Sequence, residues 1–143
     1  MLTRLARLRR RVALRRRGAA ASSPDVEAFL HVARQSFVRM QAAWDDADLS
    51  ALATLTTANL LEDLRWQLEQ RGPAPNRTEV IKLDARLLSM EELREAFVAS
   101  VEFTGVIREQ LDAGAAPFRE LWLLANLKAA GRGWRLARVQ SLS

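Results

Sequence analysis

The spacing of apolar residues along this chain changes once, near Thr78, and the change predicts helices before that point and strands after it. A long first helix is predicted after Ser23 and Pro24, which suit the N-cap and the first helical position. Its apolar residues recur at intervals of three and four and line one face: Val26, Phe29, Leu30, Ala33, Phe37, Met40 and Trp44. Aspartates at 45, 46 and 48 end this helix.

Two shorter helices follow the aspartates. Asp48 can cap the first of them, which carries Leu49, Leu52 and Leu55. Either Thr56 or Thr57 can cap the next, which ends at Gly72 and Pro73 and directs four leucines inward: Leu60, Leu61, Leu64 and Leu68.

Alternation with a period of two then predicts four strands. In the first strand, inward and outward positions alternate, and we expect the inward set to be Ile81, Leu83, Ala85 and Leu87. The other three cover residues 97–104, 118–124 and 134–138, with turns at 112–116 and 131–133 that make antiparallel hairpins. Helices followed by strands predict an α+β fold, with three N-terminal helices packed on a curved four-stranded antiparallel sheet.

Charge divides the chain into a tail and a domain. Residues 1–17 hold no acidic residue and eight arginines, namely Arg4, Arg7, Arg9, Arg10, Arg11, Arg15, Arg16 and Arg17. The remaining residues hold fourteen basic and all seventeen acidic side chains, a net charge of −3. We therefore divide the chain into a basic tail, residues 1–23, and one domain, residues 24–143.

The tail admits several interpretations. Leu2, Leu5, Leu8 and Val12 give it weak helical amphipathicity, so that it could lie on an anionic membrane surface. Its arginines could equally neutralise the phosphates of RNA or a ribosome, or form a solvated arm that binds nothing. Its composition also fits a mitochondrial presequence, whereas the chain lacks the apolar run of a secretory signal or of a membrane span.

Candidate chemistry is sparse. The chain has no cysteine and one histidine, His31, which the helical spacing places near the polar boundary of the first helix. We expect Glu102 and Glu120, which alternate with apolar neighbours, to face solvent or the concave rim of the sheet. These residues make no catalytic or metal-binding motif, so we predict a protein that is not an enzyme and that uses no metal and no cofactor.

Residues 25–143 resemble the C-terminal domain of the mitochondrial inner-membrane translocase subunit forty-four and its bacterial relatives. The resemblance rests on FLHVARQSFVRMQAAWDDADLSAL, on TTANLLEDL, on Phe118, Glu120 and Trp122 as an F-x-E-x-W-like strand, and on the terminal GWRLARVQS. It implies a cone-shaped fold of the nuclear transport factor two-like type, whose sheet curls around an apolar pocket. A related mitoribosomal large-subunit protein, number forty-five, links ribosomes to the inner membrane.

The resemblance and the charge pattern together predict a membrane-associated adaptor or tether. We expect it to dock on anionic lipid at the cytoplasmic face of a bacterial inner membrane, or at the matrix side of the mitochondrial one, with a membrane or transport protein as partner. A small-molecule-binding domain with acid–base chemistry is the alternative that uses the pocket. The side chains expected to line that pocket, or else to form plain core, are Phe29, Phe37, Trp44, Leu64, Val101, Phe103, Trp122 and Trp134.

Overall fold

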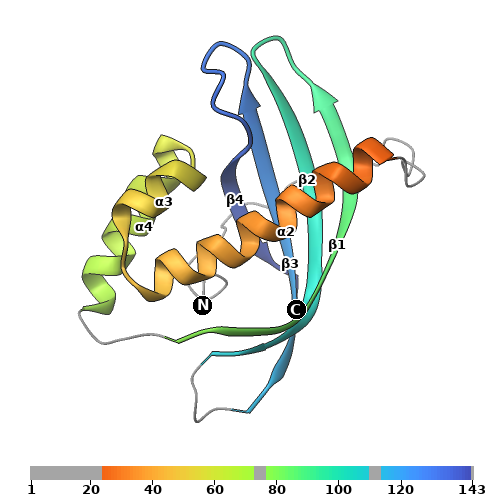
Figure 1. Cartoon of the computed structure of the whole chain (residues 1–143). Coiled ribbons are helices and arrows are strands. Elements are labelled where there is room, and N and C mark those ends of the chain that lie inside the picture. Colours follow the sequence, from red (N-terminus) through yellow and green to blue (C-terminus); the bar gives the residue numbers. More distant parts are fainter. Residues whose placement is uncertain (1–23, 73–76, 110–113, 143) are drawn as a thin grey trace.

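The computed structural model describes residues 24–72, 77–109 and 114–142, and in these residues three helices precede four strands (Figure 1). This order confirms the predicted α+β fold. The elements are α2 (Pro24–Asp45), α3 (Leu49–Leu55), α4 (Ala58–Arg71), β1 (Glu79–Glu92), β2 (Ala96–Arg108), β3 (Ala116–Leu127) and β4 (Arg135–Ser141). The basic tail lies outside the described residues.

The helix ends follow the capping residues that the sequence indicates. Asp48 Oδ1 accepts a hydrogen bond of 3.0 Å from the backbone N–H of Ala51, and so caps α3. Thr57, and not Thr56, caps α4, because the Thr56 hydroxyl donates back to the carbonyl of Leu52 at 2.8 Å. Gly72 ends α4 with a φ of 76°, a left-handed conformation that favours glycine.

The four strands form one antiparallel sheet in the order β1-β2-β3-β4. The sheet is strongly curved, α2 crosses in front of it, and α3 and α4 lie beside β4 (Figure 1). The junction between α3 and α4 is bonded to the sheet, since the N–H of Thr57 donates to the carbonyl of Leu136 at 2.9 Å. At the other end of the sheet, the carboxylate of Asp45 accepts from the N–H of Thr78 at 2.6 Å and from its hydroxyl at 3.0 Å.

One inward position predicted for β1 is wrong. Ile81 is 47% exposed, because the register with β2 shifts between Val80 and Lys82 and leaves Ile81 in a bulge. Val80 packs against the core in its place. Gly105 pairs with Leu83, just beyond this bulge, and a Cβ on it would stand 1.9 Å from the carbonyl oxygen of Lys82, so the close approach of the two strands requires glycine.

A single core fills the space between the helices and the inner face of the sheet. Apolar side chains from all three helices meet those from the three strands β2, β3 and β4. The members with almost no exposed surface are Phe37, Met40, Trp44, Leu52, Leu64, Val101, Phe103, Trp122, Leu136 and Val139. Burial of this apolar surface is the main source of stability of the fold.

Candidate functional site

An aromatic cluster lies between α2 and the inner face of β2 and β3. Phe37 of α2 places its ring 4.9 Å from that of Phe103, 5.4 Å from Phe118 and 5.0 Å from Trp122, measured between ring centroids. Alternation along β3 turns Phe118, Glu120 and Trp122 to the same face. We call Phe37, Phe103, Phe118 and Trp122 the aromatic cluster.

Glu120 is buried beside this cluster. Its side chain has no exposed surface, and its Oε1 accepts a hydrogen bond of 2.9 Å from the indole Nε1 of Trp122. Its Oε2 is buried and has no hydrogen-bond partner. Burial raises the pKa of Glu120 from 4.5 to about 7, against the lowering effect of the Trp122 hydrogen bond. The carboxyl can therefore hold or release a proton near neutral pH.

The sequence-based prediction was wrong for Glu120, which faces neither solvent nor the rim. The signal that could have placed it is its position midway between Phe118 and Trp122, two apolar inward residues of one strand. The same rule turns Glu102 outward, because its neighbours Val101 and Phe103 are buried. Its own side chain is only 9% exposed there, so the expectation that it faces solvent was wrong as well.

Glu102 is held on the outer face by two arginines. Its Oε2 lies 2.8 Å from Arg119 Nη2, and its Oε1 lies 3.3 Å from Arg86 Nη2. These pairs join β1, β2 and β3 across the outer surface, so Glu102 has a structural role there.

Gln41 is a second polar side chain on the inner side. It lies one helical turn after Phe37 and is 2% exposed, yet neither its amide oxygen nor its amide nitrogen has a hydrogen-bond partner. The one histidine of the chain, His31, is exposed on α2. No group of three or more His, Asp or Glu side chains in the described ranges could hold a metal ion.

The eight residues predicted to line a pocket all belong to the core or its edge. Six of them have almost no exposed surface: Phe37, Trp44, Leu64, Val101, Phe103 and Trp122. Phe29 and Trp134 are half-buried and pack edge to face at 5.0 Å. Their proposed role as a ligand-binding lining stays a prediction.

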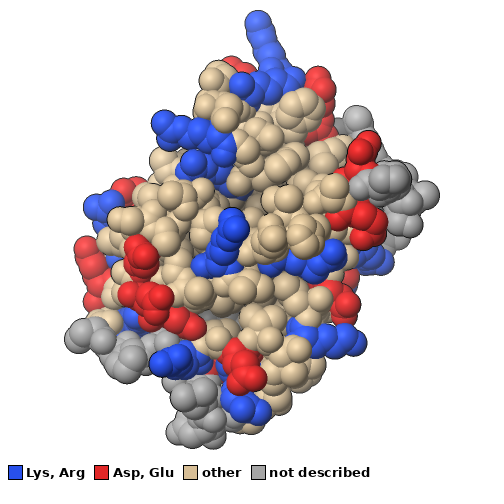
Figure 2. All heavy atoms as spheres, in the orientation of Figure 1, with Lys and Arg blue, Asp and Glu red and all other residues tan. Residues whose placement is uncertain are grey.

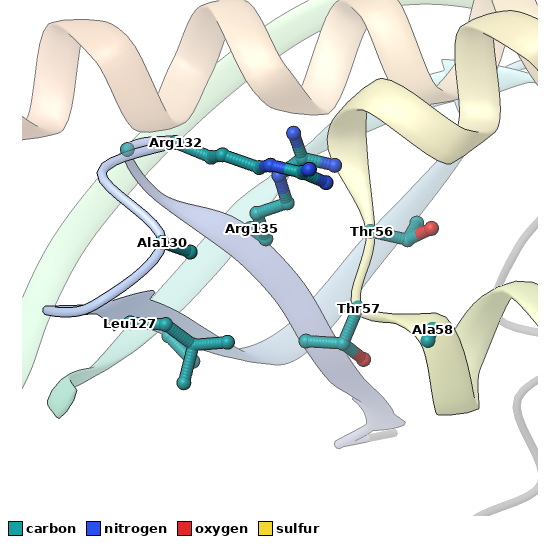
Figure 3. Close-up of a pocket in the computed structure, with 9 residues that line it drawn as sticks. Thr56, Thr57, Ala58, Leu127, Ala130, Arg132 and Arg135 are labelled. Atoms are coloured by element: carbon teal, nitrogen blue, oxygen red, sulfur yellow. The ribbon is translucent and has the colours of Figure 1, made fainter. Parts of the chain in front are cut away.

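A hollow of about 200 Å³ lies elsewhere, between the α3–α4 junction and the connection from β3 to β4 (Figure 3). Its lining contains two arginines and no acidic residue: Thr56, Thr57, Ala58, Ala125, Leu127, Ala130, Arg132, Gly133 and Arg135. Sequence reasoning missed this site, because segments about seventy residues apart form it and none carries a recognisable motif.

Charges on the face seen in Figure 2 are interspersed in sign, with basic and acidic side chains separated by neutral surface. The arginines predicted to bind membrane, residues 4–17, lie outside the described residues. Within the described part of the chain, no helix is long and apolar enough to cross a bilayer.

Comparison with known proteins agrees with this architecture. A family model described as the Tim44-like domain matches residues 11–141. A solved NTF2-like superfamily protein from Salmonella enterica serovar Typhimurium is similar in structure, with a TM-score of 0.50 and 12% sequence identity. The similarity covers 81% of this chain and 91% of that one, and it shows the NTF2-like fold. Comparison with curated proteins gives no match. Because the family model spans nearly the whole sequence, this chain belongs to the Tim44-like domain family.

Proposed function

We propose that this Tim44-like domain is a non-enzymatic adaptor that docks on anionic lipid of an inner membrane through its basic tail. Its apolar interior would then serve a protein or lipid partner, and its place would be the cytoplasmic face of a bacterial membrane or the matrix side of the mitochondrial one. Membership of a family associated with the inner membrane supports this proposal. The observation that carries it is the segregation of charge, with eight arginines and no acid in residues 1–17 of a chain whose remainder is net negative.

The energy scale of such docking is adequate. Each basic side chain near an anionic membrane contributes about 1 kcal/mol, and screening at physiological salt reduces the total well below the simple product. The rest of the chain adds little to this attraction, because its formal net charge is −3. Binding that rests on the tail is therefore expected to weaken steeply with salt.

Buried Glu120 favours a second candidate function, acid–base chemistry on a small molecule. A carboxyl whose pKa lies near 7 is a suitable proton carrier at neutral pH. The described residues place no histidine beside it, since His31 is exposed on α2. We therefore rank this function below the adaptor.

Vesicle flotation of the full chain tests the adaptor proposal. We expect flotation with cardiolipin-containing vesicles at low salt, and none with neutral vesicles. Replacing Arg9, Arg10, Arg11, Arg15, Arg16 and Arg17 by serine should abolish it. The charge-matched pair replaces three arginines each: Arg15, Arg16 and Arg17 in the tail should weaken flotation, whereas the exposed Arg39, Arg65 and Arg77 of the domain should leave it as in the wild type.

Equal flotation of the tail variant and the wild type would contradict a membrane role for the tail. Filter binding to RNA at two salt concentrations then tests the ribosome alternative. If RNA affinity falls with salt, and the same six substitutions reduce that dependence, the tail binds RNA.

A further inference from the structure

We propose that the hollow at the α3–α4 junction binds a terminal phosphate group. The hollow brings two guanidinium groups together and has no acidic residue in its lining. Arg132 extends from the β3–β4 connection and Arg135 from the first position of β4, and both side chains reach the α3 side of the hollow (Figure 3). Two like charges in one cavity disfavour each other unless an anion lies between them.

Arg135 is the fixed member of this pair. It is the first residue of β4, and its Nη1 donates a hydrogen bond of 2.6 Å to the carbonyl of Ala53 in α3. This hydrogen bond fixes the guanidinium at the wall of the hollow, where its positive charge attracts an anion.

Arg132 is the adjustable member. It is exposed, and it lies between Gly131 and Gly133, whose φ angles of 59° and 75° favour glycine at both positions. The chain reverses direction at this turn, and the Arg132 side chain lines the same hollow as Arg135. An exposed arginine on a tight turn can close over an anion without disturbing the core.

The start of α4 adds backbone donors on the third side. Thr57 already accepts hydrogen bonds from Leu60 N–H through its hydroxyl and from Leu61 N–H through its carbonyl. Ala58 and Asn59 are the first two residues of α4, so no carbonyl one turn earlier in the helix accepts from their N–H groups. The positive end of a fourteen-residue helix therefore supplements the two arginines.

The donor set favours a phosphate over a carboxylate. A terminal phosphate presents three oxygens and nearly two negative charges, which match two guanidinium groups and neighbouring N–H groups. The hollow, at about 200 Å³, is smaller than the pockets that hold drug-sized ligands. Leu127, 52% exposed, and Ala130 line it as well, so the phosphate's substituent would meet apolar surface.

Titration of the isotopically labelled full chain tests this proposal without any membrane. Inorganic phosphate and glycerol 3-phosphate are added at constant ionic strength, and amide shifts are followed by NMR. We expect saturable shifts at Thr57, Ala58, Gly131 and Gly133. Arg132→Gln should weaken binding about tenfold, the loss expected for one charge-assisted contact. The matched variant Arg77→Gln, at the far end of the sheet, should bind like the wild type.

The absence of saturable shifts in the wild type, or equal weakening by both substitutions, would overturn the proposal. Flotation with phosphatidic acid vesicles and with phosphatidylglycerol vesicles of equal charge then distinguishes the sources of the phosphate. A preference for phosphatidic acid that Arg132→Gln removes would identify a lipid headgroup, and phosphate binding without such a preference would identify a soluble phosphate compound. Equal flotation of the tail variant and the wild type would overturn the adaptor proposal and would leave the phosphate titration unchanged, so the two proposals fail separately.

Discussion

Replacing Glu120 by glutamine should stabilise the protein at alkaline pH and have little effect at acid pH. The amide of the substituted side chain would keep an oxygen to accept the hydrogen bond from Trp122 Nε1, and it would remove the possibility of a buried negative charge. At acid pH the wild-type carboxyl is itself neutral, so the two side chains then differ little.

The magnitude follows from the raised pKa. The pKa of Glu120 is about 7 in the folded protein, against 4.5 for the free side chain. The native state therefore holds the proton more tightly than the unfolded chain, and stability falls as pH rises from 4.5 to 7. At about 1.4 kcal/mol per pKa unit, the full loss above pH 7 is about 3 kcal/mol.

Urea unfolding at pH 4.5, 6, 7 and 8.5 measures this difference. We expect the free energy of unfolding of E120Q to exceed that of the wild type by about 3 kcal/mol at pH 8.5, and to equal it at pH 4.5. Glu102→Gln is the control, since it weakens the contacts with Arg86 and Arg119 on the outer face and should lower stability rather than raise it at pH 8.5. Parallel pH profiles for wild type and E120Q would refute the reasoning.

Two further predictions concern packing. Trp44→Ala should cost about 3 to 5 kcal/mol of unfolding free energy in urea, because the indole is buried; a loss below about 1 kcal/mol would indicate an open pocket at this position. Gly105→Ala should lower the free energy of unfolding by about 3 kcal/mol and therefore lower Tm, since the new Cβ would overlap the backbone carbonyl of Lys82. Gly114→Ala, where a Cβ meets nothing within 4 Å, is its control, and equal Tm values for the two variants would contradict this account.

Local rules were sufficient to predict most of the fold. The period of apolar residues identified the face of α2, and side-chain capping placed the starts of α3 and α4 within one residue. These features depend on neighbours three or four residues apart. The Ile81 bulge could not be predicted this way, because it depends on how β1 pairs with β2 and on the close approach at Gly105.

The sites were harder to predict than the fold, for two different reasons. The inward direction of Glu120 follows from strand alternation alone, but its raised pKa comes from burial, which depends on elements brought together by folding. The hollow at the α3–α4 junction requires the contact between Thr57 and Leu136, which no local pattern encodes. The distribution of charge along the sequence identifies the tail. Arg132 and Arg135 are also close together in the sequence, in GRGWR, but the hollow that they line depends on the distant residues 56–58.

The two edge strands of the sheet, β1 and β4, differ in how readily they could pair with a strand of another molecule. The β4 edge is closed by the α3–α4 junction through the bridge between Thr56 and Leu136. Among the described residues, no strand pairs with the outer edge of β1, which is fourteen residues long; two register shifts bend this edge, and it carries charged side chains such as Lys82, Asp84 and Arg86. Bends and charges of this kind oppose pairing with another strand. Loss of the bulges or of these charges would therefore make β1 the site where strand-to-strand aggregation begins.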